Sequence, residues 1–139
     1  MVEIKYPVYQ PRLNGNEKKY VNECLESTWI SSKGKFVNSF ENNFSEYVNS
    51  KYSAAVCNGT VALHLALMAL GIREGDEVIV PTLTYIASVN AITYTGATPV
   101  FVDSLESTWQ IDVEDVKKKI TSKTKAIMCV HVYGHPCDM

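Results

Sequence analysis

Apolar residues recur along the chain in two patterns, one typical of helices and the other of buried strands. Helical spacing or a long apolar run predicts helices over residues 17–27, 35–48, 61–70, 86–94 and 113–120. Shorter apolar runs bounded by turn residues predict strands over residues 54–57, 77–80, 99–102 and 126–132. Residues 1–15, which contain two prolines, are expected to form an extended arm.

The predicted strands and helices alternate at about 25 residues per unit, which is the spacing of strand–helix–strand crossovers. Within these strands, the stretches 78–80, 100–102 and 126–132 have apolar residues for both faces, so both faces of the sheet are expected to be buried. The pattern therefore predicts an α/β fold of three layers, in which helices cover both faces of a mostly parallel sheet.

Composition narrows the class of protein without changing this picture. The 139 residues are 46% apolar and 20% charged, as in a globular chain with a modest core. A net charge of −2 and the lack of a basic stripe disfavour nucleic-acid binding. No apolar run is long enough to span a membrane, the N-terminus has no signal-peptide core, and the four cysteines show no disulfide spacing. A cytoplasmic protein with reduced thiols is the simplest expectation.

The turn Asn58-Gly59-Thr60 is the first candidate site, because it joins a predicted strand to the start of a helix. The first N–H groups of a helix lack intrahelical partners and attract anions such as phosphate. Gly59 would let a ligand approach the backbone, and Thr60 adds a hydroxyl. The same residue types are also typical of a simple helix cap, so the local pattern leaves both interpretations open.

Ligands of parallel α/β sheets bind beyond the carboxyl ends of the strands. This rule predicts that the residues capable of chemistry gather along one edge of the sheet. They are residues 58–60, 82–85, Asp103 and 131–135.

Four residues near the end of the chain suggest an alternative site, since Cys and His are the usual ligands of zinc. They are Cys129, His131, His135 and Cys137. However, Cys129 and His131 alternate within a predicted strand, and no Cys-x-x-Cys pair is present. The spacing therefore disfavours a metal site.

Several motifs taken together resemble the opening of a known enzyme family. In chain order they are Trp29-Ile30-Ser31, Phe40-Glu41, 58–63, 75–81, Thr84-Tyr85, 96–103, 123–127 and 130–136. The chain resembles the DegT/DnrJ/EryC1/StrS family of nucleotide-sugar aminotransferases, which depend on pyridoxal phosphate. The resemblance covers nearly the whole chain. It implies the N-terminal part of the large domain of the type I fold of pyridoxal-phosphate enzymes.

The resemblance also implies roles for individual residues. Gly59 and Thr60 match the pair that holds the cofactor phosphate, and Tyr85 matches the aromatic residue that stacks on the pyridine ring. Asn58 stands where serine is common in the family, which leaves its own cofactor contact open. The residues expected on the substrate side are Trp29, Ser31 and His131.

For the whole enzyme, the resemblance implies transfer of an amino group from L-glutamate to a GDP-linked 4-keto-6-deoxy sugar. The product would serve the synthesis of a surface polysaccharide such as O-antigen, and the enzyme would be a homodimer with shared active sites. Residues 1–35 would form the arm, a helix and a substrate-side loop, and residues 36–139 an incomplete part of the cofactor-binding domain.

Transamination needs a lysine that forms a Schiff base and a carboxylate on the pyridinium nitrogen. In the family both are expected downstream of the stretch that ends at Met139, so this chain is expected to hold no catalytic residue and to be inactive by itself. Two alternatives stay open at this point. One is a sugar dehydratase on the same scaffold, with histidine in place of the lysine. The other is a non-catalytic chain.

Overall fold

The chain forms two compact units, Met1–Ala55 and Val56–Met139, in a computed structural model that describes residues 9–139. The first eight residues of the expected arm lie outside the described part. The first unit contains the helices α1 (Glu17–Glu26) and α2 (Lys35–Tyr47). The second contains α3 (Gly59–Ala69), β1 (Glu77–Pro81), α4 (Ile86–Tyr94), β2 (Thr98–Val102), α5 (Val113–Lys119), β3 (Thr124–Ile127) and the short 3-10 helix η1 (Val132–Gly134). No helix in residues 9–139 has the length and apolarity needed to cross a membrane.

The second unit is built on a three-stranded sheet in the order β2-β1-β3. Both strand pairs are parallel, and Ile79 in the central strand faces Val100 on one side and Ile127 on the other. Parallel neighbours require crossover connections, which α4 and α5 provide. The structure therefore confirms the predicted α/β fold with a parallel sheet.

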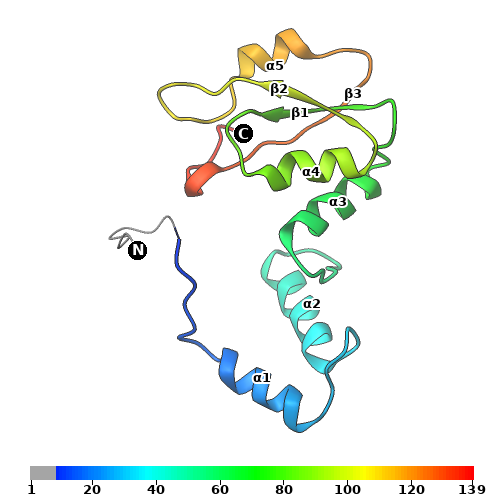
Figure 1. Cartoon of the computed structure of the whole chain (residues 1–139), viewed down its shortest axis with the longest axis vertical. Coiled ribbons are helices and arrows are strands. Elements are labelled where there is room, and N and C mark those ends of the chain that lie inside the picture. Colours follow the sequence, from blue (N-terminus) through cyan, green and yellow to red (C-terminus); the bar gives the residue numbers. More distant parts are fainter. Residues whose placement is uncertain (1–8) are drawn as a thin grey trace, which may run out of the picture. The chain divides into compact units, whose positions relative to one another are not determined.

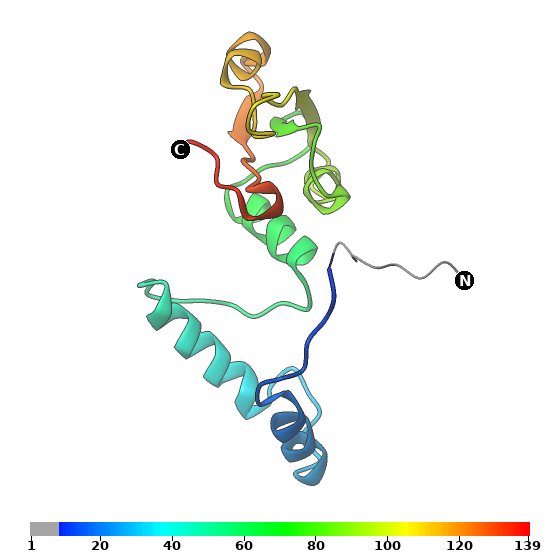
Figure 2. The ribbon, with the colours of Figure 1, turned by 90° about the vertical axis from the view of Figure 1, so that its left-hand side faces the viewer.

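Both faces of β1 are buried, because successive side chains of a strand point to opposite faces. Val78 and Val80 pack in one apolar cluster with Ala91 and Ile92 of α4. Ile79 packs in a second cluster, which also holds Val102, Ile111, Val116 and Cys137. Figures 1 and 2 show α4 and α5 on opposite sides of the sheet. The three-layer arrangement expected from the apolar runs is thus present.

The strand expected over residues 54–57 does not form. Instead, the segment is tied to α2: the N–H of Ala55 donates to Glu41 Oε1 at 2.8 Å, and the hydroxyl of Ser53 donates to the carbonyl of Glu41. A strand needs a neighbour with which to share its backbone hydrogen bonds. None of the described strands pairs with residues 54–57, so the apolar run was an insufficient signal.

The last strand is shorter than the predicted 126–132. Its ladder ends at Ile127, and one further bond joins the N–H of Met128 to the carbonyl of Ile79 at 2.8 Å. The chain then turns into η1, where Tyr133 has a φ of 53° and Gly134 a φ of 82°. These left-handed conformations turn the chain just after the predicted strand, and residues 128–132 add no further strand to the sheet although they are largely apolar.

Aspartate is a common N-cap residue, so the sequence predicts a cap at Asp112, just before the helix expected at 113–120. The structure confirms it, since Oδ1 of Asp112 accepts from the N–H of Glu114 at 2.9 Å. Asp115, three positions later, would complete a capping box by accepting from the N–H of Asp112. That expectation is wrong, because this N–H donates to the carbonyl of Asp103 at 2.9 Å. Asp115 Oδ2 instead accepts from the N–H of Asp103 at 2.9 Å and from Lys119 Nζ at 2.8 Å. The carboxylate thus joins the helix to the end of β2.

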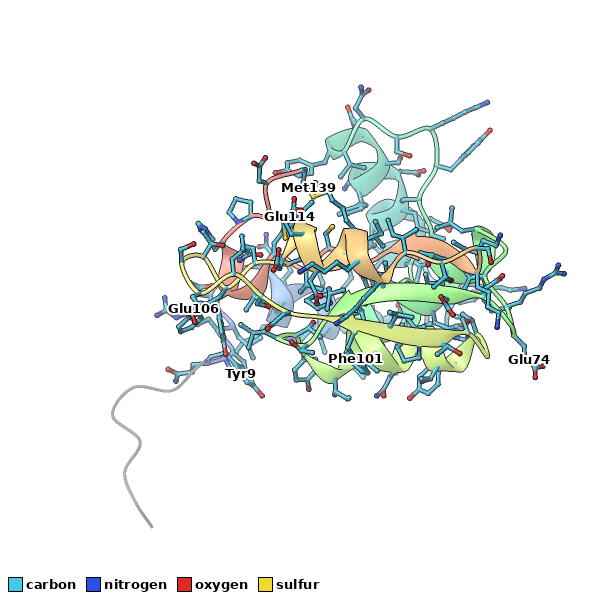
Figure 3. The ribbon with its side chains drawn as sticks, turned by 90° about the horizontal axis from the view of Figure 1, so that it is seen from above. Tyr9, Glu74, Phe101, Glu106, Glu114 and Met139 are labelled. Atoms are coloured by element: carbon cyan, nitrogen blue, oxygen red, sulfur yellow. The ribbon has the colours of Figure 1, made fainter. Side chains whose placement is uncertain are left out.

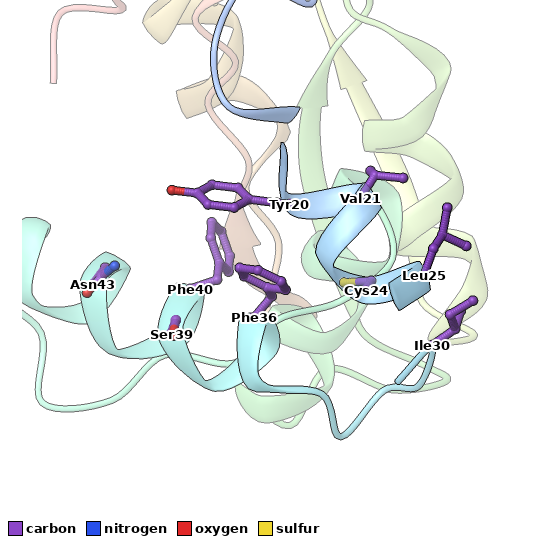
Figure 4. A pocket seen from close by; sticks show the side chains of 9 residues that line it. All are labelled: Tyr20, Val21, Cys24, Leu25, Ile30, Phe36, Ser39, Phe40 and Asn43. Atoms are coloured by element: carbon purple, nitrogen blue, oxygen red, sulfur yellow. The ribbon is translucent and has the colours of Figure 1, made fainter. Parts of the chain in front are cut away.

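The helices of the first unit face each other with aromatic side chains and leave an apolar hollow between them. The rings of Tyr20 and Phe36 lie 4.9 Å apart between centroids. Figure 4 shows the hollow, which has a volume of about 730 Å³. Its apolar lining side chains include Val21, Leu25 and Phe40, each more than half exposed.

The hydrogen bonds of Asp115 predict a pH dependence of stability. The bond from Lys119, followed by the bond from Asp103, holds the pKa of Asp115 below its ordinary value of 3.8. A depressed pKa in the folded state adds stability above the unfolded value, and this is lost as pH falls through the folded value. Between neutral pH and a pH well below 3.8, the free energy of unfolding should therefore fall less in Asp115→Asn than in the wild type.

Urea unfolding followed by circular dichroism checks this prediction. Glu114→Gln is the matched control, because Glu114 is exposed on the same helix and its side chain pairs, among residues 9–139, only with Lys117. An equal pH effect in wild type and Asp115→Asn would contradict the assignment.

Candidate active site

The carboxyl ends of the three parallel strands lie at one edge of the sheet. Residues 82–85 follow β1 and Asp103 follows β2, while the segment leading to His131 follows β3. Figure 3 makes the direction visible, since Glu74, before β1, and Glu106, after β2, lie at opposite ends of the sheet. The topology therefore confirms that these segments share an edge.

The N-terminus of α3 combines a helix cap with free backbone donors. Asn58 has an extended backbone, and its Oδ1 accepts from the N–H of Val61 at 3.0 Å. The N–H groups of Gly59 and Thr60 have no hydrogen-bond partner among residues 9–139. A Cβ added at Gly59 would meet no atom within 4 Å, so the space in front of this backbone is open. The two interpretations of the turn are compatible, because the cap uses a different N–H.

A hollow of about 390 Å³ is lined by three of the four predicted cofactor residues, all except Gly59. Asn58 and Thr60 contribute from the start of α3, and Tyr85 from the start of α4. The side chain of Tyr85 is 79% exposed, so one flat aromatic face is available to a ligand. The remaining lining residues are Val61, Ile86, Ala87, Asn90 and Tyr94.

Two of these lining residues, Asn90 and Tyr94, were not identified from the sequence. They follow Ile86 at intervals of four, which places all three on one face of α4. A polar asparagine within an apolar helix was the available signal. Tyr94 also contacts His64 of α3, with ring centroids 5.7 Å apart. His64 thus packs edge-on against an aromatic ring.

Asp103 lies at the expected edge, but its polar groups are occupied by the local backbone. Its Oδ1 accepts from the N–H of Ser104 at 2.8 Å, and its carbonyl accepts from the N–H of Asp112 at 2.9 Å. Together with the bond to Asp115, these contacts connect β2 to α5. A structural role therefore accounts for this aspartate.

Trp29 and Ser31, the expected sugar-side residues, lie in the loop between α1 and α2 of the first unit. Trp29 is 57% exposed, and its Cδ1 would stand 2.8 Å from a Cβ added at Gly34. Ser31 Oγ accepts from the N–H of Lys33 at 3.3 Å. The absence of a side chain at Gly34 thus lets the indole pack against the loop, and the sugar contact of both residues stays a prediction.

His131 and Cys137 meet at the end of the chain. The ring nitrogen Nδ1 of His131 accepts from the backbone N–H of Cys137 at 3.0 Å. Burial, followed by the neighbouring Cys137, raises the pKa of the Cys129 thiol, which favours its neutral form. Within residues 9–139, no three His, Cys, Asp or Glu side chains are grouped to hold a metal ion.

Comparison with known proteins supports a common origin for this arrangement. The DegT/DnrJ/EryC1/StrS aminotransferase family matches residues 11–139. The chain is 72% identical over 137 residues to the GDP-perosamine synthase of Escherichia coli O157:H7, with 98% of this chain and 38% of the relative covered. The chain thus spans less than two fifths of that relative's length.

Two solved structures of relatives have closely similar backbones. The PLP form of the putative sugar aminotransferase Spr1654 from Streptococcus pneumoniae has a TM-score of 0.87 and 38% identity, covering 96% of this chain and 34% of that chain. A GDP-4-keto-6-deoxymannose-3-dehydratase with a trapped PLP–glutamate geminal diamine has a TM-score of 0.83 and 30% identity, covering 96% and 36%.

The cap at Asn58 generates a prediction about stability. Asn58→Ala should lower the free energy of unfolding by about 1 kcal/mol, because the N–H of Val61 loses its acceptor. Asn58→Ser should preserve most of the stability, since a serine hydroxyl also caps helices. Thermal and urea unfolding of the two variants check this. An Asn58→Ala variant as stable as the wild type would show that the bond to Val61 contributes nothing.

Proposed function

Because the chain belongs to the DegT/DnrJ/EryC1/StrS aminotransferase family, we propose that the complete protein is a sugar aminotransferase that depends on pyridoxal phosphate. It transfers an amino group from L-glutamate to a GDP-linked 4-keto-6-deoxy sugar, as a GDP-perosamine synthase would. The observation that carries this proposal is the 72% identity to the Escherichia coli GDP-perosamine synthase across 98% of the chain.

The residues around α3 fit the phosphate end of the cofactor. Two backbone N–H groups and a hydroxyl converge at the start of the helix, where the helix dipole also favours an anion. The open space at Gly59 leaves room for phosphate oxygens against the backbone. When bound, pyridoxal phosphate supplies an electron sink for the exchange of the amino group.

The residues of the proposed site have separate tasks. Gly59 and Thr60 hold the phosphate, and Asn58 keeps the first turn of the helix in place. The exposed ring of Tyr85 lies against the pyridine face. Ile86 and Val61 provide apolar walls that exclude water from the site. The residues that we propose on the substrate side are Trp29, Ser31 and His131.

Wider features of the whole protein are part of the same proposal. Residues 1–35 serve the substrate side, and residues 36–139 belong to the cofactor-binding domain. The enzyme works as a cytoplasmic homodimer and supplies an amino sugar for a surface polysaccharide such as O-antigen. The exposed apolar side chains between α1 and α2 support an assembly that covers them, which sedimentation of the complete protein checks.

A sugar dehydratase is the second candidate, favoured by the similarity to the GDP-4-keto-6-deoxymannose-3-dehydratase at a TM-score of 0.83. Its identity of 30% is far below the 72% shared with the perosamine synthase, so we prefer the aminotransferase.

Incubating the complete protein with pyridoxal phosphate, glutamate and GDP-4-keto-6-deoxymannose separates the candidates. We expect a GDP-linked 4-amino sugar by mass spectrometry. A 3-deoxy sugar without nitrogen would overturn the proposal in favour of the dehydratase.

The phosphate pocket predicts the effect of Thr60→Ala. Loss of one hydrogen bond to a charged group should weaken cofactor binding by about 1–2 kcal/mol, roughly 5- to 30-fold. Fluorescence titration of the apoenzyme with pyridoxal phosphate measures it. Thr93→Ala is the control, because Thr93 is an exposed residue of α4 that does not line the hollow. An unchanged affinity in Thr60→Ala would refute the pocket assignment.

The stacking role of Tyr85 predicts a difference between two substitutions. Tyr85→Phe should bind the cofactor almost as well as the wild type, because stacking needs only the aromatic face. Tyr85→Ala should bind it more weakly, by about 0.5–1.5 kcal/mol or more. The absorbance of bound cofactor after gel filtration reports retention. Equal damage from both substitutions would indicate that the hydroxyl is the important group.

A further inference from the structure

The hydrogen bond at His131 determines which ring nitrogen carries the proton. A neutral imidazole has one donor and one acceptor nitrogen. Nδ1 accepts from the backbone N–H of Cys137 at 3.0 Å, and a backbone N–H can only donate. The proton therefore lies on Nε2. Since the side chain is exposed, this N–H is available to an external acceptor.

The donor that orients the ring is itself anchored in the core. Cys137 is 7% exposed and packs in the same cluster as Ile79 of the central strand. Its thiol donates to Oε1 of Gln110, which is 5% exposed, at 3.0 Å. The exposed ring of His131 is thus bonded to the backbone of Cys137, whose side chain is fixed in the core by Gln110. These contacts restrict the rotation of the ring.

The position of His131 is suited to ligand contact. The bond from Met128 N–H to the carbonyl of Ile79 keeps the chain beside β1 just before His131. The ring therefore lies beyond the carboxyl end of β3, at the same edge as residues 82–85, which follow β1. At this edge of a parallel sheet a fixed N–H donor can meet an oxygen of a bound ligand.

We propose that His131 is a preoriented hydrogen-bond donor, through Nε2–H, to an oxygen of the nucleotide-sugar substrate, and that Cys137 and Gln110 are its positioning residues. The identity of the acceptor rests on the proposed function. The tautomer and its anchoring rest only on the contacts of His131, Cys137 and Gln110.

Two substitutions at His131 separate the role of the donor Nε2–H from that of Nδ1, which accepts from Cys137. In His131→Asn the amide oxygen can take the place of Nδ1 and still accept from Cys137, but nothing replaces Nε2–H. In His131→Gln the amide nitrogen can take the place of Nε2, while the acceptor at Nδ1 is lost. A purely structural histidine would tolerate His131→Asn in every assay.

We expect His131→Asn in the complete protein to raise KM for the GDP-4-keto sugar about 3- to 10-fold, with a smaller change in kcat. Hydrogen exchange of the Cys137 amide should stay slow in this variant. In His131→Gln that exchange should accelerate, with a smaller rise in KM. A wild-type KM in His131→Asn would overturn the donor role.

The ¹⁵N chemical shifts of the His131 ring, measured at mildly alkaline pH, test the tautomer without any assay of activity. We expect a protonated Nε2 and an unprotonated Nδ1. A protonated Nδ1 would overturn the inference even in an active enzyme. If the wild-type protein makes no amino sugar, the proposed function fails, whereas the ring shifts and the amide exchange still decide the inference.

Discussion

The parallel pairing of β1 with two neighbours is the constraint on which the second unit depends. Val78, Ile79 and Val80 are fully buried, so each face of this strand needs its own cover. That requirement explains why α4 and α5 lie on opposite sides of the sheet. It also places the segments after all three strands at one edge, where the candidate site is found.

At this edge, the N-terminus of α3 contributes both to stability and to the candidate ligand site. Asn58 satisfies only the N–H of Val61, and the N–H groups of Gly59 and Thr60 stay unpaired within the described residues. Pairing these groups within the protein would stabilise α3 but close the site to an anion. Gly59 in the first turn also lowers the stability of the helix, because glycine has a low helix propensity. Its missing side chain leaves room for a ligand to approach the backbone N–H groups.

Residues 131–137 are connected to the core by hydrogen-bonding groups that take no part in the strand pairing of the sheet. Gln110, in the loop before α5, bonds the thiol of Cys137, and the amide of Cys137 bonds His131. The cluster around Ile79 therefore supports both the strand and the orientation of a side chain at the site edge. Packing and site geometry are joined here by two polar contacts rather than by the backbone ladder.

The amino-acid sequence by itself determined the elements whose signal is local. The helix at 86–94, the helix cap at Asp112, the parallel sheet and the shared edge all followed from periodicity, capping residues and the spacing of crossovers. The candidate pair Gly59-Thr60 and the ring of Tyr85 were also recognised in this way, through motifs that resemble a family.

Only the tertiary structure decided the features that depend on partners distant in the chain. Residues 54–57 are apolar enough for a strand, but a ladder needs a neighbour, and the N–H of Ala55 bonds the side chain of Glu41 instead. The carboxylate of Asp115 accepts from the backbone N–H of Asp103, at the end of β2, rather than from the N–H of Asp112 at the start of its own helix. The proton of His131 is placed by an amide that the fold brings back to it. A local pattern carries no information about such contacts, because they exist only once the chain has folded.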